Sequence, residues 1–145
     1  MGFRPRKLSL TLLQALAQRV SSAKIYIDSK IYSSIGKGVL AYVCFEKYDS
    51  EEAIEKFMSK IMNFSFFQGD SSSLSASLRE IGGELMIVSQ FTLSAITHKG
   101  NKPSFHRAAS TEKANYLYDL LIEKLNECPI HCQSGIFGSD MDIHS

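Results

Sequence analysis

The stretch ELMIVSQFTL, residues 84–93, is the most informative in the sequence. Its first half, Leu85 to Val88, is an apolar run typical of a strand that is buried on both faces. Its second half places Ser89, Gln90 and Thr92 at the end of that strand. Polar groups that terminate a buried strand need hydrogen-bond partners, so the pattern indicates either a capped strand end or a binding site.

The residues before this stretch predict further strands. Val39–Phe45 is almost continuously apolar, which is typical of a second strand with both faces covered. Ala23–Asp28 alternates with period two and is followed by the turn Ser29-Lys30 and by Ile31–Ile35, which predicts a hairpin. The glycines of Gly36-Lys-Gly38 separate this hairpin from the buried strand.

Two amphipathic helices are predicted, one on each side of residues 84–93. The first begins after a cap at Asp49 or Ser50, and its apolar residues recur at steps of three and four: Ala53, Ile54, Phe57, Met58, Ile61 and Met62. The second begins after Ser110 or Thr111 and has the apolar face Ala114, Leu117, Tyr118, Leu121, Ile122 and Leu125. With short strands expected at 64–67, 130–133 and 137–143, the order of elements predicts an α+β fold with mixed or antiparallel sheets.

Composition favours one domain and excludes several protein classes. The chain has 145 residues, of which 44% are hydrophobic, which suits a single domain with its own core. Sixteen basic and fifteen acidic residues leave a net charge of +1, so any contact with RNA has to be local. Three cysteines are an odd number without a framework spacing, which favours free thiols in the cytosol. No apolar run approaches the roughly 20 residues needed to span a bilayer.

Residues 1–12 are interpreted as an N-terminal extension. Arg4, Arg6 and Lys7 precede an apolar run that ends at Ala17, an arrangement shared with secretory signals. Thr11 interrupts that run, and cleavage after Ala17 would remove most of a strand expected at residues 15–20. The first element of the domain is therefore expected after the extension.

Searches for cofactor and metal motifs are negative. Cys128-Pro-Ile-His-Cys132 places two thiols and an imidazole close together, but a structural zinc site needs four ligands and no second pair is present. The sequence has no phosphate-binding P-loop and no dinucleotide-binding glycine motif. We therefore expect neither a metal nor a cofactor. A Ser/His esterase remains an open alternative, with Ser89 as the nucleophile and His98 or His106 as its base.

A basic segment follows the polar strand end. Residues 96–107 contain His98, Lys99, Lys102, His106 and Arg107 around Pro103-Ser-Phe105. Cations can bind the phosphates of RNA while an aromatic ring stacks on a base, so the segment is a candidate RNA contact. The alternative is that these residues form a solvated loop.

Motifs spread along the chain resemble those of the D-aminoacyl-tRNA deacylases. They are Gln18-Arg-Val20, Gly82-Gly-Glu-Leu85, Ser89-Gln-Phe-Thr-Leu93, Lys99-Gly100, Lys102-Pro-Ser-Phe105 and Gly135-Ile-Phe-Gly-Ser-Asp-Met141. The resemblance covers residues 13–145, which we take as a deacylase-like domain. It implies mixed and antiparallel sheets curled into a barrel-like sandwich. It also implies hydrolysis of the ester between a D-amino acid, or glycine, and the terminal adenosine of tRNA, by a cytosolic homodimer without metal.

The resemblance also implies roles for single residues. The backbone amides of Phe91 and Thr92 are expected to stabilise the oxyanion, with Ser89 and Gln90 binding the substrate. In the family the 2′-hydroxyl of the RNA takes part in the chemistry. Three further groups complete the expected site: Phe105 beside the adenine, Arg19 as a substrate-binding residue, and Lys99, Lys102 and Arg107 on tRNA phosphates.

The sequence departs from the family pattern near its C-terminal end. Members continue into a segment with Asn-x-Gly-Pro-Val-Thr, whose Gly-cisPro pair enters the partner's pocket and excludes L-amino acids, whereas this sequence ends at Ser145. Ile136 occupies a position where relatives usually have Arg. The resulting expectation is weak deacylation with a poor D-over-L preference. A catalytically weak tRNA-binding or dimer-forming relative is the alternative.

Overall fold

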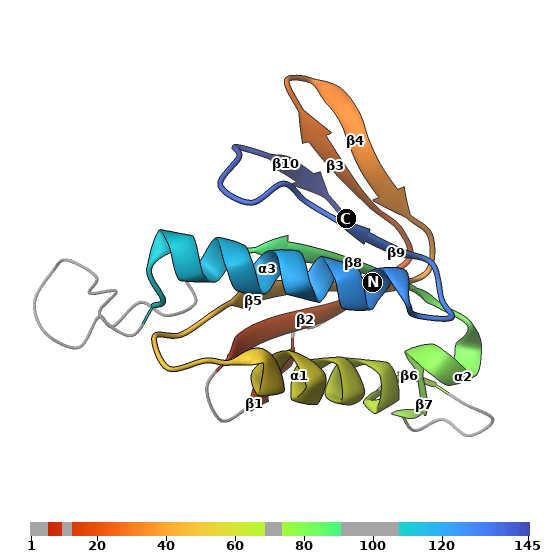
Figure 1. Cartoon of the computed structure of the whole chain (residues 1–145). Helices are drawn as coiled ribbons and strands as arrows, with labels where there is room; N and C mark the ends of the chain where they lie inside the picture. The colour runs from red at the N-terminus through yellow and green to blue at the C-terminus, as the bar shows by residue number, and fades with distance from the viewer. Residues whose placement is uncertain (1–5, 10–12, 69–73, 91–107) are drawn as a thin grey trace, which may run out of the picture.

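The apolar runs around residues 39–45 and 85–88 form neighbouring strands in the middle of a five-stranded sheet (Figure 1). The computed structural model describes residues 6–9, 13–68, 74–90 and 108–145. The strand order of this sheet is β1-β2-β5-β8-β9. The bounds are β1 Arg6–Ser9, β2 Gln14–Val20, β5 Gly38–Cys44, β8 Glu84–Ser89 and β9 Cys132–Ser134.

The five-stranded sheet is mixed, as the sequence predicted. Strand β2 runs antiparallel to β1 and β5, whereas β5, β8 and β9 are parallel to one another. The α+β class is therefore confirmed. The barrel-like curl is not confirmed, because the sheet is open and β1 and β9 are its edge strands among the described residues. A barrel needs strands that pair all the way round, and here the ladder ends on both sides.

Two smaller sheets and three helices complete the described fold. The three-stranded sheet has the order β10-β3-β4, with β3 Ala23–Ile27, β4 Lys30–Ile35 and β10 Asp142–His144. Strands β6 Ser65–Gln68 and β7 Leu74–Ser77 pair with each other. The helices are α1 Glu51–Asn63, α2 Leu78–Ile81 and α3 Thr111–Asn126. Both amphipathic helices were predicted, whereas the four-residue α2 was not.

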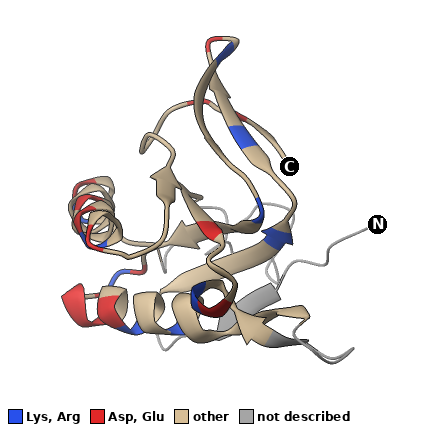
Figure 2. Ribbon diagram, turned by 90° about the vertical axis from the view of Figure 1, so that its right-hand side faces the viewer, with Lys and Arg blue, Asp and Glu red and all other residues tan. Residues whose placement is uncertain are grey.

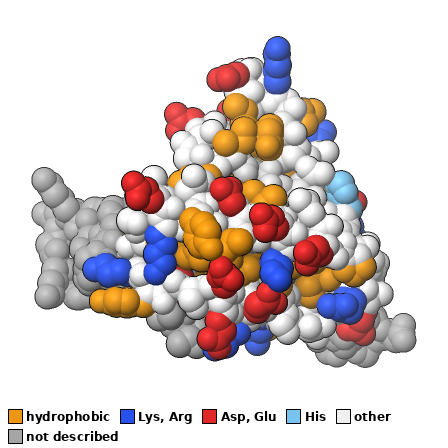
Figure 3. Space-filling model, in the orientation of Figure 1, with side chains coloured by type: hydrophobic (Ala, Val, Ile, Leu, Met, Phe, Trp, Pro, Cys, Tyr) orange, Lys and Arg blue, Asp and Glu red, His pale blue; other side chains and the backbone are white. Residues whose placement is uncertain are grey.

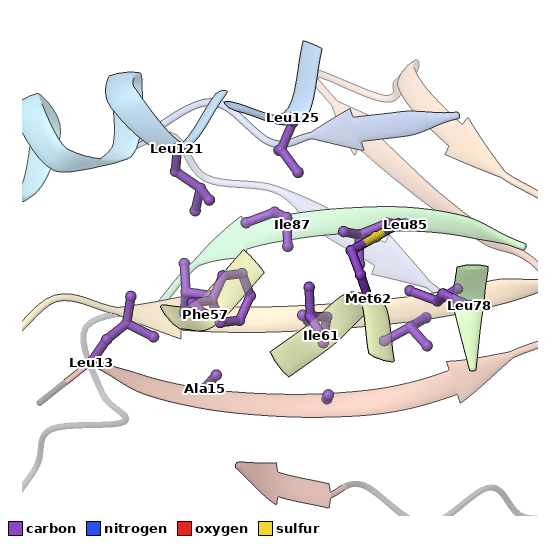
Figure 4. Close-up of a cluster of buried hydrophobic side chains, with 14 of the residues drawn as sticks. Leu13, Ala15, Phe57, Ile61, Met62, Leu78, Leu85, Ile87, Leu121 and Leu125 are labelled. Atoms are coloured by element: carbon purple, nitrogen blue, oxygen red, sulfur yellow. The ribbon is translucent and has the colours of Figure 1, made fainter. Parts of the chain in front are cut away.

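The two predicted helices bury their apolar faces on one side of the five-stranded sheet. Phe57 and Ile61 from α1 and Leu121 from α3 reach the same core as Leu85 and Ile87 from β8 (Figure 4). Each of these five side chains is fully buried, which makes this cluster the main hydrophobic stabilisation of the described fold. Of the two caps proposed for α1, Ser50 occupies the N-cap position, although its side chain makes no capping hydrogen bond.

The three-stranded sheet covers the opposite side. Ile25 and Ile35 from this sheet pack with Leu40, Met86 and Val88 from the central strands. The predicted hairpin is confirmed, and its turn residues with positive φ are Asp28 and Ser29, at 51° and 64°. The turn therefore begins one residue earlier than the sequence suggested. Both faces of β5 and β8 are covered, which explains why their sequences are continuously apolar.

Part of the N-terminal extension belongs to the main sheet. Arg6–Ser9 forms β1 and pairs with β2, with Arg6 opposite Ala17. Strand β2 pairs with β5 along its whole length, from Gln14 to Val20. Cleavage after Ala17 would therefore divide a strand that lies inside the sheet.

Charge is unevenly distributed over the described surface. Acidic residues gather on α1 and α3, where they are interspersed with lysines (Figures 2 and 3). The two ion pairs of the described residues also lie there, joining Lys56 to Glu52 at 3.3 Å and Lys124 to Glu55 at 2.7 Å. No helix in the described ranges is long and apolar enough to cross a membrane.

Candidate functional site

A cavity lies where the parallel strands β5 and β8 end. Its volume is about 370 Å³, within the range of about 300–1,000 Å³ that is usual for small-molecule sites. The carboxyl ends of parallel strands are a common place for ligands in mixed α and β folds. The described lining residues are Cys44, Phe45, Ser89, Gln90, Ala108, Ala109, Thr111, Ala114, Phe137, Gly138, Ser139 and Asp140.

Pairing between β5 and β8 fixes the two polar residues that the sequence placed at the strand end. Val43 lies opposite Ser89, and the backbone N–H of Gln90 donates to the carbonyl of Val43 at 2.7 Å. The ladder therefore continues to Gln90. Because this amide is already hydrogen-bonded, Gln90 offers its side chain to the cavity and not its backbone N–H.

The second wall comes from the segment that leads into α3. Ala109 donates its N–H to the carbonyl of Phe45 at 3.0 Å, which ties this segment to the end of β5. Ser110 then caps α3, and its side chain accepts from the N–H of Lys113 at 3.2 Å. Thr111 and Ala114, in the first turn of the helix, border the cavity. The helix therefore presents its positive dipole end on this side of the site.

The third wall, Phe137 to Asp140, is held by a buried tyrosine. The hydroxyl of Tyr118 lies 2.8 Å from the carbonyl of Gly135 and 3.3 Å from that of Ile87, and it can donate to either. Burial raises the pKa of Tyr118 far above its ordinary value, so the hydroxyl keeps its proton and remains a donor. Its ring packs 5.9 Å from that of Phe137, measured between centroids. Tyr118 thus fixes the segment that contains this wall.

Several polar side chains of the cavity have no hydrogen-bond partner within the described chain. They include the hydroxyls of Ser89 and Thr111, the amide of Gln90 and the carboxylate of Asp140. Asp140 is the one charged side chain of the described lining, which contains neither histidine nor lysine. Convergent polar groups that are free to bind, next to apolar walls, are typical of a ligand site.

The structure separates the predicted site residues into three groups. Ser89 and Gln90 line the cavity, as expected. Arg19 lies elsewhere: it pairs with Val39 at the start of β5, about 13 Å along the strands from Ser89 at 3.3 Å per residue. Its Nη1 donates to the carbonyl of Phe66 at 3.2 Å. Outside the described residues lie Phe91, Thr92, His98, Lys99, Lys102, Phe105, His106 and Arg107.

Other lining residues were not identified from the sequence. Cys44 ends a buried strand and Ala114 is one of several apolar residues on α3, so neither has a local feature that marks a site. Thr111 was considered only as a helix cap. Phe137 to Asp140 belongs to a motif that the sequence had singled out, but its position in the cavity wall depends on tertiary packing.

The cysteines of the Cys128–Cys132 segment belong to no larger group of potential metal ligands among the described residues. No cluster of three or more His, Cys, Asp or Glu side chains suited to a metal occurs in the described ranges. Burial, together with the neighbouring Cys128, raises the pKa of Cys132 to about 12. This thiol therefore stays protonated at neutral pH.

Comparison with known proteins gives the family. The model of the D-Tyr-tRNA(Tyr) deacylase family matches residues 16–145, a range that includes all the described residues around the cavity. The chain belongs to this family. It is 40% identical over 131 residues to the D-aminoacyl-tRNA deacylase of Pseudoalteromonas translucida, and the aligned region covers 90% of each chain. It is 42% identical over 132 residues to that of Flavobacterium psychrophilum, covering 90% of this chain and 88% of the relative.

Two solved structures share the fold of this chain. The c-Myc DNA Unwinding Element Binding Protein superposes with a TM-score of 0.83 and 34% identity, over 90% of this chain and 89% of that one. A probable eukaryotic D-amino acid tRNA deacylase superposes with a TM-score of 0.73 over 92% of this chain and 93% of that one. At 19% identity, the second likeness concerns the fold alone.

Proposed function

We propose that the chain hydrolyses the ester bond between a D-amino acid, or glycine, and the 3′-terminal adenosine of tRNA. This activity serves quality control in translation, because it releases the wrong amino acid and returns a free tRNA. The observation that supports it most strongly is the family match over residues 16–145, together with relatives of about 40% identity named D-aminoacyl-tRNA deacylase.

The cavity suits this substrate in size and polarity. A volume of about 370 Å³ accommodates an aminoacyl group and part of a nucleoside, but not folded RNA. The tRNA must therefore insert its 3′ end. Apolar walls at Phe45 and Phe137 can contact the ring of an adenine or of an aromatic amino acid, while the free side chains of Ser89 and Gln90 can bind hydroxyl groups.

In this proposal the chemistry depends on backbone donors and not on a side-chain nucleophile. Attack of water on the ester creates an oxyanion, which fixed N–H groups stabilise without reorganisation. The amide of Gln90 is engaged with Val43, so the oxyanion donors are assigned to the amides of Phe91 and Thr92. Ser89 binds the substrate in this proposal, and the alternative of Ser89 as a nucleophile would need His98 or His106, both outside the described residues, as its base.

The proposal includes three contacts beyond the cavity. Phe105 flanks the adenine, and the cations Lys99, Lys102 and Arg107 bind phosphates of the acceptor end. Arg19, which lies away from the cavity of its own protomer, acts at the pocket of a partner copy in a cytosolic homodimer. An apolar contact between copies is supported by Ile31 and Tyr32 on β4 of the three-stranded sheet, whose side chains are 56% and 49% exposed. A monomer mass in sedimentation equilibrium would contradict the dimer.

Turnover of three purified substrates tests the function. D-Tyr-tRNA, L-Tyr-tRNA and Gly-tRNA are incubated with the chain, and the released amino acid is measured against spontaneous hydrolysis. We expect the D-ester and the glycyl ester to be hydrolysed faster than their spontaneous rates, and the rate for the L-ester measures the D-over-L preference. If none of the three is hydrolysed faster than its spontaneous rate, the chain is not a deacylase, and a tRNA-binding role is the remaining alternative. If simple esters are hydrolysed in preference to aminoacyl-tRNA, the chain is an unrelated esterase.

A further inference from the structure

Asp140 stands out in the cavity because it is the one charged side chain of the described lining. It follows the turn at Gly138, whose φ of 75° is a left-handed conformation that glycine adopts without strain. Its carboxylate is exposed and has no hydrogen bond or ion pair within the described chain. A carboxylate with free lone pairs at the wall of a binding cavity is available to a cationic group of the ligand.

The proposed substrate contains one such group. An aminoacyl ester has a free α-amino group, two bonds from the ester carbonyl carbon, and this group is an ammonium ion near and below neutral pH. For an amino acid without a cationic side chain, such as tyrosine or glycine, the remainder of the substrate's 3′ end is neutral or anionic, so the α-ammonium group is its one cation. A cavity of about 370 Å³ is on the order of 7 Å across, so an ester near Ser89 can place its ammonium group against Asp140.

We propose that the Asp140 carboxylate binds the α-ammonium group of the aminoacyl ester and thereby distinguishes a free amino group from an acylated one. The inference rests on the proposed function, since it assigns the substrate's orientation in the same cavity. It gives the site a specificity that chirality does not provide: esters with a free amino group are accepted, whereas N-acylated esters, such as peptidyl-tRNA, leave the carboxylate unpaired. An N-acylated ester therefore binds without the ion pair that holds the free amine, which is the basis of the discrimination.

The other described groups of the cavity do not serve this role. The hydroxyls of Ser89 and Thr111 and the amide of Gln90 can accept a hydrogen bond, but they carry no charge. Cys44 is the second ionisable side chain of the described lining, and it is buried at 4% exposure. The positive end of α3 favours anions, so the helix does not compete for an ammonium group.

A binding measurement tests the inference without requiring turnover. The probe is 3′-(D-tyrosylamino)-3′-deoxyadenosine, in which an amide replaces the ester, and its N-acetyl derivative is the comparison. Calorimetry at pH 6 gives both dissociation constants for the wild type and for Asp140→Asn, Asp140→Glu and Asp142→Asn. Asp142 is exposed on β10 and does not line the cavity, which makes its substitution the matched control for loss of one carboxylate.

We expect the wild type to bind the free-amine probe about 10- to 100-fold more tightly than the N-acetyl probe, the usual effect of one charged hydrogen bond. Asp140→Asn should remove most of that preference, Asp140→Glu should retain it at least in part, and Asp142→Asn should leave it intact. Raising the pH to 9, above the ordinary pKa of an α-amino group at about 8, should weaken the preference in the wild type and in every variant that retains it, and should change little in Asp140→Asn.

Three results would overturn the inference: no preference in the wild type, a preference that survives Asp140→Asn, or equal weakening of both probes by that substitution. The proposed function has a separate readout, since the same proteins are assayed with D-Tyr-tRNA. Selective binding of the free amine without turnover would support the inference and contradict the hydrolase. Turnover of D-Tyr-tRNA without a preference for the free-amine probe over the N-acetyl probe would support the hydrolase and contradict the role of Asp140.

Discussion

Ala114→Phe should abolish deacylation while leaving the fold intact. Ala114 lies in the first turn of α3 and lines the cavity, so a phenyl ring at this position occupies space that the ester and adenosine need. Displacement of a reacting group by about 1 Å can cost about 100-fold in rate, so complete blockage should lower kcat/KM for D-Tyr-tRNA by more than that. The measurement is single-turnover release of D-tyrosine, with thermal unfolding followed in parallel.

The control for this prediction is Asn115→Phe. Asn115 is the next residue of the same helix turn, is exposed and does not line the cavity. The two variants gain the same ring on the same helix, so they differ chiefly in whether the ring enters the cavity. Equal activity of the two variants would show that the cavity at the ends of β5 and β8 is not the site of hydrolysis.

Gly38→Ala should destabilise the fold strongly. A Cβ atom on Gly38 would lie 1.7 Å from the carbonyl oxygen of Glu84 and 2.6 Å from its carbonyl carbon, and both belong to the backbone of the neighbouring strand. Relief of this clash requires β5 and β8 to separate where Gly38 pairs with Glu84. We expect a loss of about 3 kcal/mol or more in the free energy of unfolding, measured as a shift of the urea midpoint.

Gly36→Ala is the matched control for that loss. The nearest atom to its added Cβ is Oε1 of Glu84 at 3.2 Å, the end of a flexible side chain that can move. We expect a change of less than about 1 kcal/mol, partly offset by the reduced entropy of the unfolded chain. Comparable destabilisation by both substitutions would mean that the close approach of β5 and β8 is not the cause.

Local pattern was sufficient for the central elements of the fold. Strands β5 and β8 are buried on both faces, so their sequences are apolar without interruption, and α3 has one apolar face because it packs on a single sheet. Helix α2 was missed because four residues give no periodicity. Its available signal was the capping box between Ser77 and Glu80, which the structure contains.

Elements that depend on long-range contacts were less predictable. Strand β1 is four residues long and acquires its identity from pairing with β2, so the sequence suggested only an extension. Among the described residues β1 and β9 are edge strands, so the barrel-like curl is not confirmed, and closure is decided by strand registers that no local pattern encodes. Short edge strands of this kind therefore cannot be predicted from local sequence pattern alone.

The candidate site was predictable in part. Ser89 and Gln90 were found because polar residues at the end of a buried strand are unusual, and both line the cavity. Thr111 and Asp140 come from elements far apart in sequence, and only the packing of α3 against the sheet brings them together. Arg19 is about four residues along the strands from the cavity, and its role at a substrate pocket stays a prediction.

The most direct test of the central claim is the single-turnover rate of D-Tyr-tRNA hydrolysis by the wild type and by Ser89→Ala. The claim is that the cavity cleaves the ester with backbone donors, so the Ser89 hydroxyl only contacts the substrate. We predict release of D-tyrosine by the wild type above the spontaneous rate and a rate within about fivefold for the variant, as expected for the loss of one neutral hydrogen bond. A loss of about a thousandfold or more would make Ser89 a nucleophile and contradict the account.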